Sequence, residues 1–132
     1  LRERSFGSLD LKTSSEYRSL FEALKDMSDD EVWKWKIVDD METAQDAVER
    51  FSNALEEIAK AYFCKKVLVL WHGTVNRSFL VKIGYGSFKE FGNGTFKNTG
   101  YAVLESDGKA FKVLETFGVE KKNIWIDFVI II

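Results

Sequence analysis

Hydrophobic residues recur with helical spacing in two stretches of the first half of the chain. The first stretch follows a capping box, Thr13-Ser14-Ser15-Glu16, and predicts a helix that reaches Met27. The second stretch covers residues 43–63 and predicts a helix that faces the core. Its apolar positions form one stripe: Ala44, Ala47, Val48, Phe51, Leu55, Ile58 and Tyr62. Between the two stretches, residues 32–38 alternate between apolar and charged side chains, which predicts a half-buried strand.

The second half of the chain predicts strands. Residues 66–71 form an apolar run that predicts a buried strand, and residues 79–85 alternate as a second strand would. Two further segments, 101–106 and 109–117, flank Asp107-Gly108. This dipeptide favours a two-residue hairpin turn, because both positions tolerate positive φ.

Residues 124–132 are apolar on both faces of a predicted strand, as in a central strand that is covered above and below. Asp127 interrupts this run, and a lone carboxylate there is costly unless it is paired or used. The patterns together predict a single α+β domain, residues 1–132. It would have two N-terminal helices with an intervening strand, and then a mostly antiparallel sheet.

Composition excludes several classes of partner. Lys and Arg number 19 against 21 Asp and Glu, so no basic surplus indicates a nucleic acid partner. Cys64 is the only cysteine, which excludes an intrachain disulfide and a cysteine-based zinc cluster and fits a reducing intracellular compartment, cytoplasmic or nuclear. No apolar run approaches the roughly 18 residues of a membrane span, so no membrane partner is expected.

His72 is the only histidine, and the apolar run before it leads directly into Gly73-Thr74. Such a segment offers a ring nitrogen and a bare backbone to a ligand, although an isolated histidine at a strand end is also an ordinary structural residue. Glycines followed by aromatic rings recur in Gly84-Tyr85-Gly86 and in residues 91–96. Glycines of this kind let a ligand approach the backbone closely while a ring lies above it.

In chain order, Leu70-Trp71-His72-Gly73-Thr74 and Phe91-Gly92-Asn93-Gly94-Thr95-Phe96 follow a predicted helix, strand and second helix. This succession resembles the catalytic domain of the poly(ADP-ribose) polymerase-like ADP-ribosyltransferases over residues 15–96. The resemblance implies an ADP-ribosyltransferase-like fold and an enzyme that transfers single ADP-ribose units. It also implies NAD as the substrate and a protein as the acceptor.

The resemblance assigns roles to the matching positions. The residues that it implies for NAD binding are His72, Gly73, Thr74, Gly94, Phe96 and Tyr101. Among them, His72 would hydrogen-bond a ribose hydroxyl, and the Gly73 backbone would hold the nicotinamide amide. Phe96 would stack on the nicotinamide ring, with Tyr101 as the alternative.

The catalytic residues that the resemblance implies are His72 and Asp127. Asp127-Phe128-Val129-Ile130 resembles the context in which the family places a catalytic glutamate, with a side chain that is one methylene shorter. A displacement of about 1 Å can lower a rate roughly a hundredfold. Glu105 and Glu115, beside the predicted hairpin, are the alternative acids, and no metal ligands are implied.

Two other kinds of function stay open. One is a non-catalytic member of the same fold, or an unrelated α+β protein-binding module, that uses an exposed aromatic loop at residues 85–96. Phe88, Phe91 and Phe96 would then anchor the partner. The other is a small nuclease or hydrolase that uses His72 with a nearby acid. The sequence shows no second base or set of metal ligands of the kind those reactions normally need.

Overall fold

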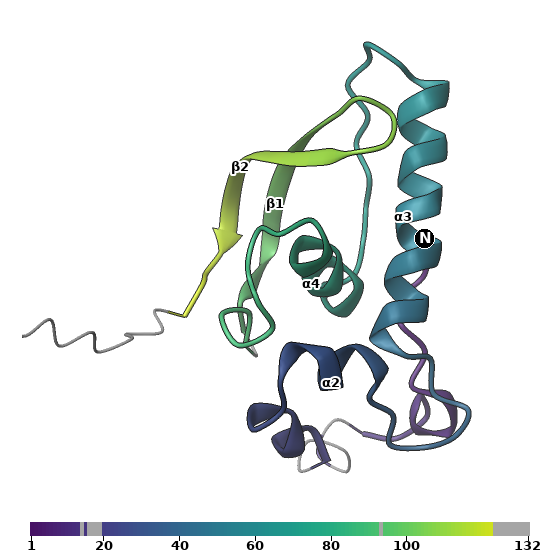
Figure 1. The fold of residues 1–132 in the computed structure, drawn as a ribbon, viewed down its shortest axis with the longest axis vertical. Coiled ribbons are helices and arrows are strands. Elements are labelled where there is room, and N and C mark those ends of the chain that lie inside the picture. Colours follow the sequence, from purple (N-terminus) through teal and green to yellow (C-terminus); the bar gives the residue numbers. More distant parts are fainter. Residues whose placement is uncertain (14, 16–19, 93, 123–132) are drawn as a thin grey trace, which may run out of the picture.

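The computed structural model describes residues 1–13, 15, 20–92 and 94–122, and over these residues the fold is α+β (Figure 1). The α-helices are α2 (Asp29–Lys34), α3 (Ala44–Ala61) and α4 (Gly73–Lys82). Two short 3-10 helices, η1 (Gly7–Leu9) and η2 (Leu20–Lys25), precede them, and strands β1 (Phe96–Ser106) and β2 (Phe111–Val119) follow them. The predicted strand 124–132 with Asp127, and part of the predicted capping box (Ser14 and Glu16), lie outside the described residues.

Helix α3 confirms the prediction made from its apolar stripe. It begins with a capping box, in which the Thr43 hydroxyl accepts the Asp46 N–H at 2.9 Å and the Asp46 carboxylate accepts the Thr43 N–H at 3.4 Å. One side of the helix buries Ala44, Ala47, Val48, Phe51 and Leu55. Tyr62, the last position of the predicted stripe, falls after the helix and is 56% exposed. Packing of the buried side, more than intrinsic propensity, stabilises a helix of this kind.

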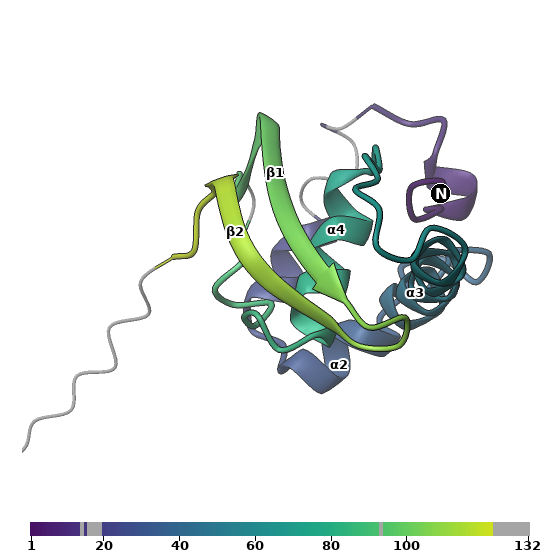
Figure 2. The ribbon, with the colours of Figure 1, turned by 90° about the horizontal axis from the view of Figure 1, so that it is seen from above.

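Helix α4 lies between α3 and the hairpin of β1 and β2 (Figures 1 and 2). The Phe79 ring contacts Phe51 of α3 at 5.4 Å between ring centroids and Phe111 of β2 at 5.5 Å. Val75 and Leu80 are buried beside it. The predicted strand over residues 79–85 is therefore wrong. Positions 75, 79 and 80 fall on one side of a helix, and a helix pairs its own backbone groups without a neighbouring strand.

Residues 32–38 do not form the predicted strand either. Helix α2 begins with a capping box, in which the Ser28 hydroxyl accepts the Glu31 N–H at 3.4 Å and the Glu31 carboxylate accepts the Ser28 N–H at 2.8 Å. Trp33 packs edge-on against Phe88, with 4.7 Å between the ring centroids. An alternation of a few residues fits a helix or a strand, and here the capping box favours the helix.

The hairpin confirms the prediction of two antiparallel strands around Asp107-Gly108. Ser106 pairs with Phe111, so the connection has four residues rather than the predicted two. The Asp107 carboxylate accepts the N–H groups of Lys109 at 2.9 Å and Ala110 at 2.8 Å. Gly108 has a φ of 94°, a value that glycine adopts without strain.

Residues 66–71 are not paired as a strand, contrary to the prediction. Val69 and Trp71 pack against the core, but Leu68 is 88% exposed and Leu70 is 81% exposed. No backbone group of Val67–Trp71 forms a hydrogen bond with another described residue. The segment therefore covers the core with one face only. It forms no strand, because a strand needs a neighbouring strand to pair its backbone N–H and C=O groups.

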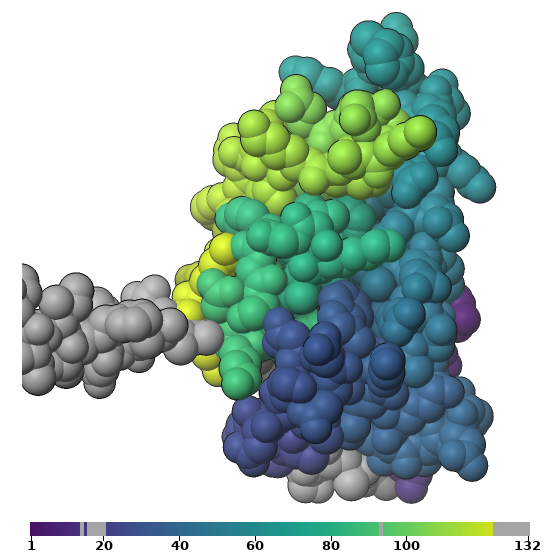
Figure 3. Space-filling model, viewed as in Figure 1, coloured from purple at the N-terminus to yellow at the C-terminus, as the bar shows by residue number. Residues whose placement is uncertain are grey.

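Helix α2, the loop after α4 and the hairpin follow one another along α3, and they form a continuous surface in the space-filling view (Figure 3). The interior beneath this surface centres on Phe51, Phe79 and Phe91, each at most 1% exposed. Across the described ranges, no helix combines the length and the apolar character that crossing a membrane requires.

Candidate functional site

The first turn of α4 holds a carboxylate from the other end of the chain. Glu3 Oε2 accepts the Thr74 N–H at 3.1 Å, and Glu3 Oε1 accepts the Val75 N–H at 3.0 Å. The first N–H groups of a helix have no partner within the helix, and they lie at the positive end of its dipole. Together they form a site that binds anions, and Glu3 fills it with the two oxygens of one carboxylate.

His72 stands directly before this turn, at the N-cap position of α4. Its backbone is extended (φ −116°, ψ 155°), its side chain is exposed, and that side chain makes no capping hydrogen bond. Its carbonyl oxygen accepts the Asn76 N–H at 2.9 Å, which fixes the residue to the helix. The next residue, Gly73, faces open space, since a Cβ there would meet nothing within 4 Å. A ligand at the start of α4 can therefore contact the imidazole and the backbone of Gly73.

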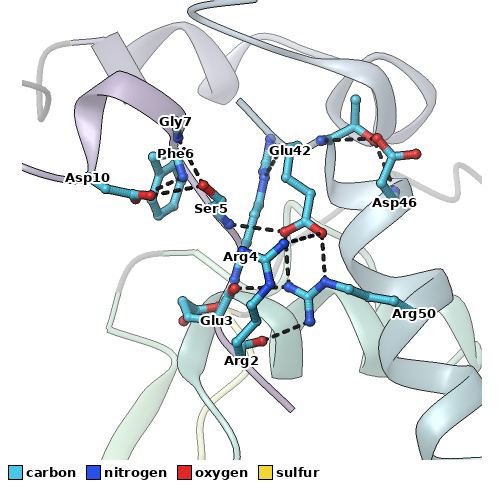
Figure 4. A network of polar contacts seen from close by, with 11 residues as sticks. Arg2, Glu3, Arg4, Ser5, Phe6, Gly7, Asp10, Glu42, Asp46 and Arg50 are labelled. Carbon is cyan, nitrogen blue, oxygen red and sulfur yellow. Dashed lines mark hydrogen bonds and ion pairs between the residues drawn. The ribbon is translucent and has the colours of Figure 1, made fainter. Parts of the chain in front are cut away.

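A polar network fixes the N-terminal segment that carries Glu3 (Figure 4). Arg50 of α3 donates to both carboxylate oxygens of Glu42, at 2.6 and 2.9 Å. It also donates to the carbonyl oxygens of Arg2 at 3.0 Å and Glu3 at 2.9 Å, while Glu42 accepts the Ser5 N–H at 3.0 Å. The hydrogen bond with Arg50 lowers the pKa of Glu42 and raises the pKa of Arg50. The paired charges thus tie the segment to α3 and hold Glu3 over α4.

A cavity of about 260 Å³ lies beside the start of α4. Segments that are far apart in the sequence line it: the N-terminal segment, η2, α2, the start of α3, α4, the loop before β1 and the start of β1. The lining residues are Glu3, Arg4, Phe21, Leu24, Val32, Ala44, Gly73, Thr74, Arg77, Ser78, Phe88, Gly92, Gly94, Thr95 and Phe96. A larger, more open recess of about 630 Å³ lies between α2, α3 and α4, but its lining includes neither His72 nor a residue of the first turn of α4.

Two arginines line the smaller cavity. Arg4 is 5% exposed, and it donates to the carbonyl oxygens of Glu42 at 2.7 Å and Trp35 at 3.0 Å. Burial lowers the pKa of Arg4 to about 10, so its guanidinium stays charged at neutral pH. Arg77 donates to the Phe88 carbonyl oxygen at 2.7 Å, and burial lowers its pKa as well. Two cationic side chains therefore line the cavity, Arg4 buried and Arg77 partly buried.

Four of the residues predicted as a binding site, Gly73, Thr74, Gly94 and Phe96, line this one cavity. His72 precedes them but is exposed and is not part of the lining. The remaining predicted binding residue, Tyr101, lies elsewhere.

Tyr101 is on the outer face of the hairpin. Its ring stacks on Phe117 at 5.7 Å between centroids, and its hydroxyl donates to Glu115 at 2.7 Å. Glu115 accepts this bond at the exposed surface, and Glu105 is exposed on the same hairpin. These residues do not line the cavity beside α4. Asp127 lies outside the described residues.

The loop of residues 85–96 is not the exposed aromatic surface that the sequence suggests. Phe88 is 5% exposed and Phe91 is 0% exposed, and the Phe91 ring lies 6.0 Å from that of Phe96. The rings point inward, because packing against apolar side chains of α2 and α4 removes them from water. Phe88 and Phe91 are therefore core residues and Phe96 packs partly buried against the core, so the hypothesis that these rings form an exposed partner anchor is wrong.

Sequence reasoning gave no role to Glu3, Arg4 or Arg77. Glu3 meets Thr74 and Val75 across 71 and 72 positions of the chain, and no periodic pattern reports such a contact. Among the residues that the structure describes, no group of three or more His, Cys, Asp or Glu side chains is placed to hold a metal ion.

The family model described as histidine phosphatase superfamily (branch 1) matches residues 1–117. The chain has no match among curated proteins and none among solved structures. The family match overturns the resemblance to ADP-ribosyltransferases. An ADP-ribosyltransferase activity, NAD as substrate and a protein acceptor of ADP-ribose are therefore wrong predictions. They rested on two short strings, residues 70–74 and 91–96, and the structure places His72-Gly73-Thr74 of the first string at the start of α4.

Proposed function

Because the chain belongs to the histidine phosphatase superfamily, we propose that it acts on phosphate monoesters and binds their phosphoryl group at the start of α4, beside His72. The observation that carries this proposal is the Glu3 carboxylate on the N–H groups of Thr74 and Val75, directly after the only histidine. An anion already occupies the position where the backbone favours one. A phosphoryl group is an anion of similar size to a carboxylate, and it has three terminal oxygens instead of two.

The geometry supports specific contacts for that phosphoryl group. Two of its oxygens would replace the Glu3 carboxylate on the N–H groups of Thr74 and Val75. A third would reach the Gly73 N–H, which donates to no described residue, and the exposed imidazole of His72. Phosphoryl transfer depends on positioning and on stabilising negative charge, and these are what a helix N-terminus and an imidazole supply.

The displaced Glu3 remains the acid nearest to the bound ester, since it is the only carboxylate among the cavity residues. In the proposed reaction the bond between phosphorus and the leaving oxygen breaks. Glu3, a carboxylate while it accepts the N–H groups of α4, takes up a proton from solvent after the phosphoryl group displaces it, and it gives this proton to the leaving oxygen. Water or another hydroxyl supplies the new oxygen on phosphorus, and the proton that this nucleophile loses returns to solvent. With water as acceptor the products are an alcohol and inorganic phosphate. Proton donation of this kind typically contributes about 10²–10⁴-fold to a rate.

The test is the release of inorganic phosphate from phenyl phosphate and from para-nitrophenyl phosphate. His72→Ala should lower kcat/KM for both compounds by roughly a hundredfold or more, because it removes a contact to the charged group. Glu3→Gln should lower kcat much more for phenyl phosphate, whose poor leaving group needs a proton. Lys109→Ala, an exposed change in the hairpin connection, serves as the control. Absence of phosphate release by the unmodified chain, or full activity in His72→Ala, would refute the proposal.

A further inference from the structure

The recess of about 630 Å³ between α2, α3 and α4 has the size of a ligand site, since such sites typically enclose about 300–1,000 Å³. Its lining residues on α2, and those on α3, are spaced by three and four positions, so each set lies on one side of its helix. These residues are Asp30, Trp33 and Lys34 on α2 and Gln45, Val48 and Glu49 on α3. Val81 and Lys82, in the last turn of α4, complete the lining.

The apolar part of this lining consists of Trp33, Val48 and Val81. Val48 is 2% exposed, and the partly buried Trp33 ring is fixed edge-on against Phe88 at 4.7 Å between ring centroids. The indole N–H of Trp33 donates to no residue in the described ranges. An indole combines a large apolar surface with one donor, so it suits a ligand that is apolar on one side and polar on another.

Lys82 places a cation beside this apolar surface. Its Nζ donates to Ser52 Oγ at 3.0 Å, and Ser52, which is 4% exposed, donates to the Val48 carbonyl oxygen at 2.7 Å. Glu49 precedes Ser52 by three positions and is therefore its neighbour on α3. Lys82 nevertheless forms no ion pair with Glu49 or with another described acid. A neutral hydroxyl thus positions the ammonium group and leaves its charge unpaired.

The two acids of the recess are unpaired as well. Asp30 precedes Lys34 by four positions, an order and spacing that favour an ion pair on a helix, but these two residues form none. Glu49 Oε1 accepts the Gln45 Nε2 at 3.2 Å, a neutral donor. Both carboxylates can therefore bind a ligand without first losing an ion pair.

The charges around the recess balance, with two carboxylates against two ammonium groups. A ligand with a single charge would find two partners but would also meet two like charges, which disfavour it. A ligand that carries one charge of each sign finds partners for both. The unpaired charges therefore select a dipolar ligand, and the surface of Trp33, Val48 and Val81 selects one with an apolar body.

We propose that this recess binds a zwitterion with an apolar body, the chemistry of an aromatic amino acid or of a dipeptide with an apolar side chain. The ammonium group of the ligand pairs with Asp30 and Glu49. Its carboxylate pairs with Lys82, and its apolar part covers the Trp33 ring. The inference goes beyond the proposed function, because the recess includes no residue of the phosphoryl position at the start of α4.

Calorimetric titration with ligands that share a phenyl group tests the charge requirement. The zwitterions are phenylalanine and alanyl-phenylalanine, and the singly charged analogues are phenethylamine and 3-phenylpropanoate. The tighter of the two zwitterions should bind at least about tenfold more tightly than either analogue, because each analogue lacks one charge-assisted contact. The order of the two zwitterions shows whether the recess takes a free amino acid or a dipeptide.

Two exposed substitutions separate the contacts. Glu49→Gln should lower the preference over 3-phenylpropanoate, which has no ammonium group, about threefold, because Asp30 remains. Lys82→Gln should lower the preference over phenethylamine, which has no carboxylate, by a similar factor. Glu57→Gln removes an exposed acid of α3 that does not line the recess, so it is the matched control and should change neither ratio.

The indole N–H resonance of Trp33 locates the site, because it should shift with the zwitterion and saturate at the concentration that calorimetry gives. Equal affinity for all four ligands, or no binding at millimolar concentration, would overturn the inference. So would a preference that both Glu49→Gln and Lys82→Gln leave intact, or binding that leaves the Trp33 resonance in place. Amide spectra of the variants confirm that each is folded before its ratios are compared.

Discussion

The flank of α4 and its first turn belong to one ten-residue helix but have opposite surroundings. On the flank, Val75, Phe79 and Leu80 are at most 1% exposed and pack between α3 and the hairpin. At the first turn, His72 and Gly73 are exposed, and a carboxylate from the N-terminal segment takes the N–H groups. The flank is apolar and filled, whereas the first turn is polar, partly exposed and capped by the Glu3 carboxylate.

This contrast distinguishes the residues of α4 that stabilise the fold from the residues that are placed to bind a ligand. Filling the space between α3 and the hairpin fixes the position and direction of α4, because close-packed side chains tolerate little displacement. The direction of α4 then points its free N–H groups at one spot beside His72. Changes on the flank should therefore lower the free energy of unfolding, and changes at the first turn should act mainly on ligand binding.

The largest expected effect is on the flank. Phe79→Ala removes a fully buried ring that contacts Phe51 and Phe111, so it should lower the free energy of unfolding by about 3–5 kcal/mol. Denaturant-induced unfolding followed by circular dichroism measures this change. Phe117→Ala is the matched control, because Phe117 is 61% exposed and its loss should cost far less. Equal losses in the two variants would contradict the assignment of the core.

The second effect concerns the ion pair that fixes the N-terminal segment over the first turn. Glu42→Gln should lower the free energy of unfolding at neutral pH by about 1–3 kcal/mol, since it leaves Arg50 without its charged partner. The pKa of Glu42 is lowered in the folded chain, so its stabilisation is complete above the ordinary value of 4.5 and is lost as the pH falls through the lowered pKa.

Unfolding of the unmodified chain and of Glu42→Gln between about pH 7 and pH 3 checks this sign. The difference in free energy of unfolding should shrink as the pH falls. A difference that stays constant, or that grows toward acidic pH, would rule out Glu42 as the titrating group.

The third effect separates stability from binding at the first turn itself. Glu3→Ala removes a group that caps α4, so it should cost only about 1 kcal/mol of stability. It should nevertheless tighten the binding of inorganic phosphate, because it removes the competing anion, while phosphate release from phenyl phosphate slows. Thermal unfolding measures the change in stability, and calorimetric titration measures the change in phosphate affinity. Weaker phosphate binding in this variant would show that Glu3 does not occupy the phosphoryl position.

The smallest effect on the free energy of unfolding is expected in residues 66–71, the segment before α4. Leu70→Ala should change the free energy of unfolding by no more than about 0.5 kcal/mol, because Leu70 is 81% exposed. Its neighbour Trp71 provides the matched comparison, since its ring contacts Phe51 and Phe79. Trp71→Ala should cost clearly more than Leu70→Ala in the same denaturant experiment. A reversed order would mean that the outer face of residues 66–71 is covered in solution.

Local signals explain which parts of the fold were predictable. The stripe of α3 lies within one helix and Asp107-Gly108 lies within one connection, so the sequence predicts the helix and the antiparallel hairpin, though not the length of the turn. Residues 66–71 have the composition of a buried strand, but a strand also requires neighbours, which its own sequence does not encode. Residues 79–85 alternate by coincidence, and the helix is favoured there by packing on Phe51 and Phe111.

The candidate site was predictable only in part. His72, Gly73 and Thr74 stood out because a lone histidine before glycine is a local signal, and they do lie at the start of α4. Their expected ligand was wrong, since the same short string fits more than one family. Glu3 and Arg77 carry no local signal: their significance comes from a contact with a distant turn and from burial beside a cavity.

Amide NMR spectra recorded during a titration with inorganic phosphate test most directly whether the phosphoryl group binds at the start of α4. The resonances of Gly73, Thr74 and Val75 should move together and saturate in the unmodified chain, and the same amides should respond far more weakly in His72→Ala. If these three amides stay in place while phosphate shifts others, or if His72→Ala saturates at the same concentration, the site is not where we place it.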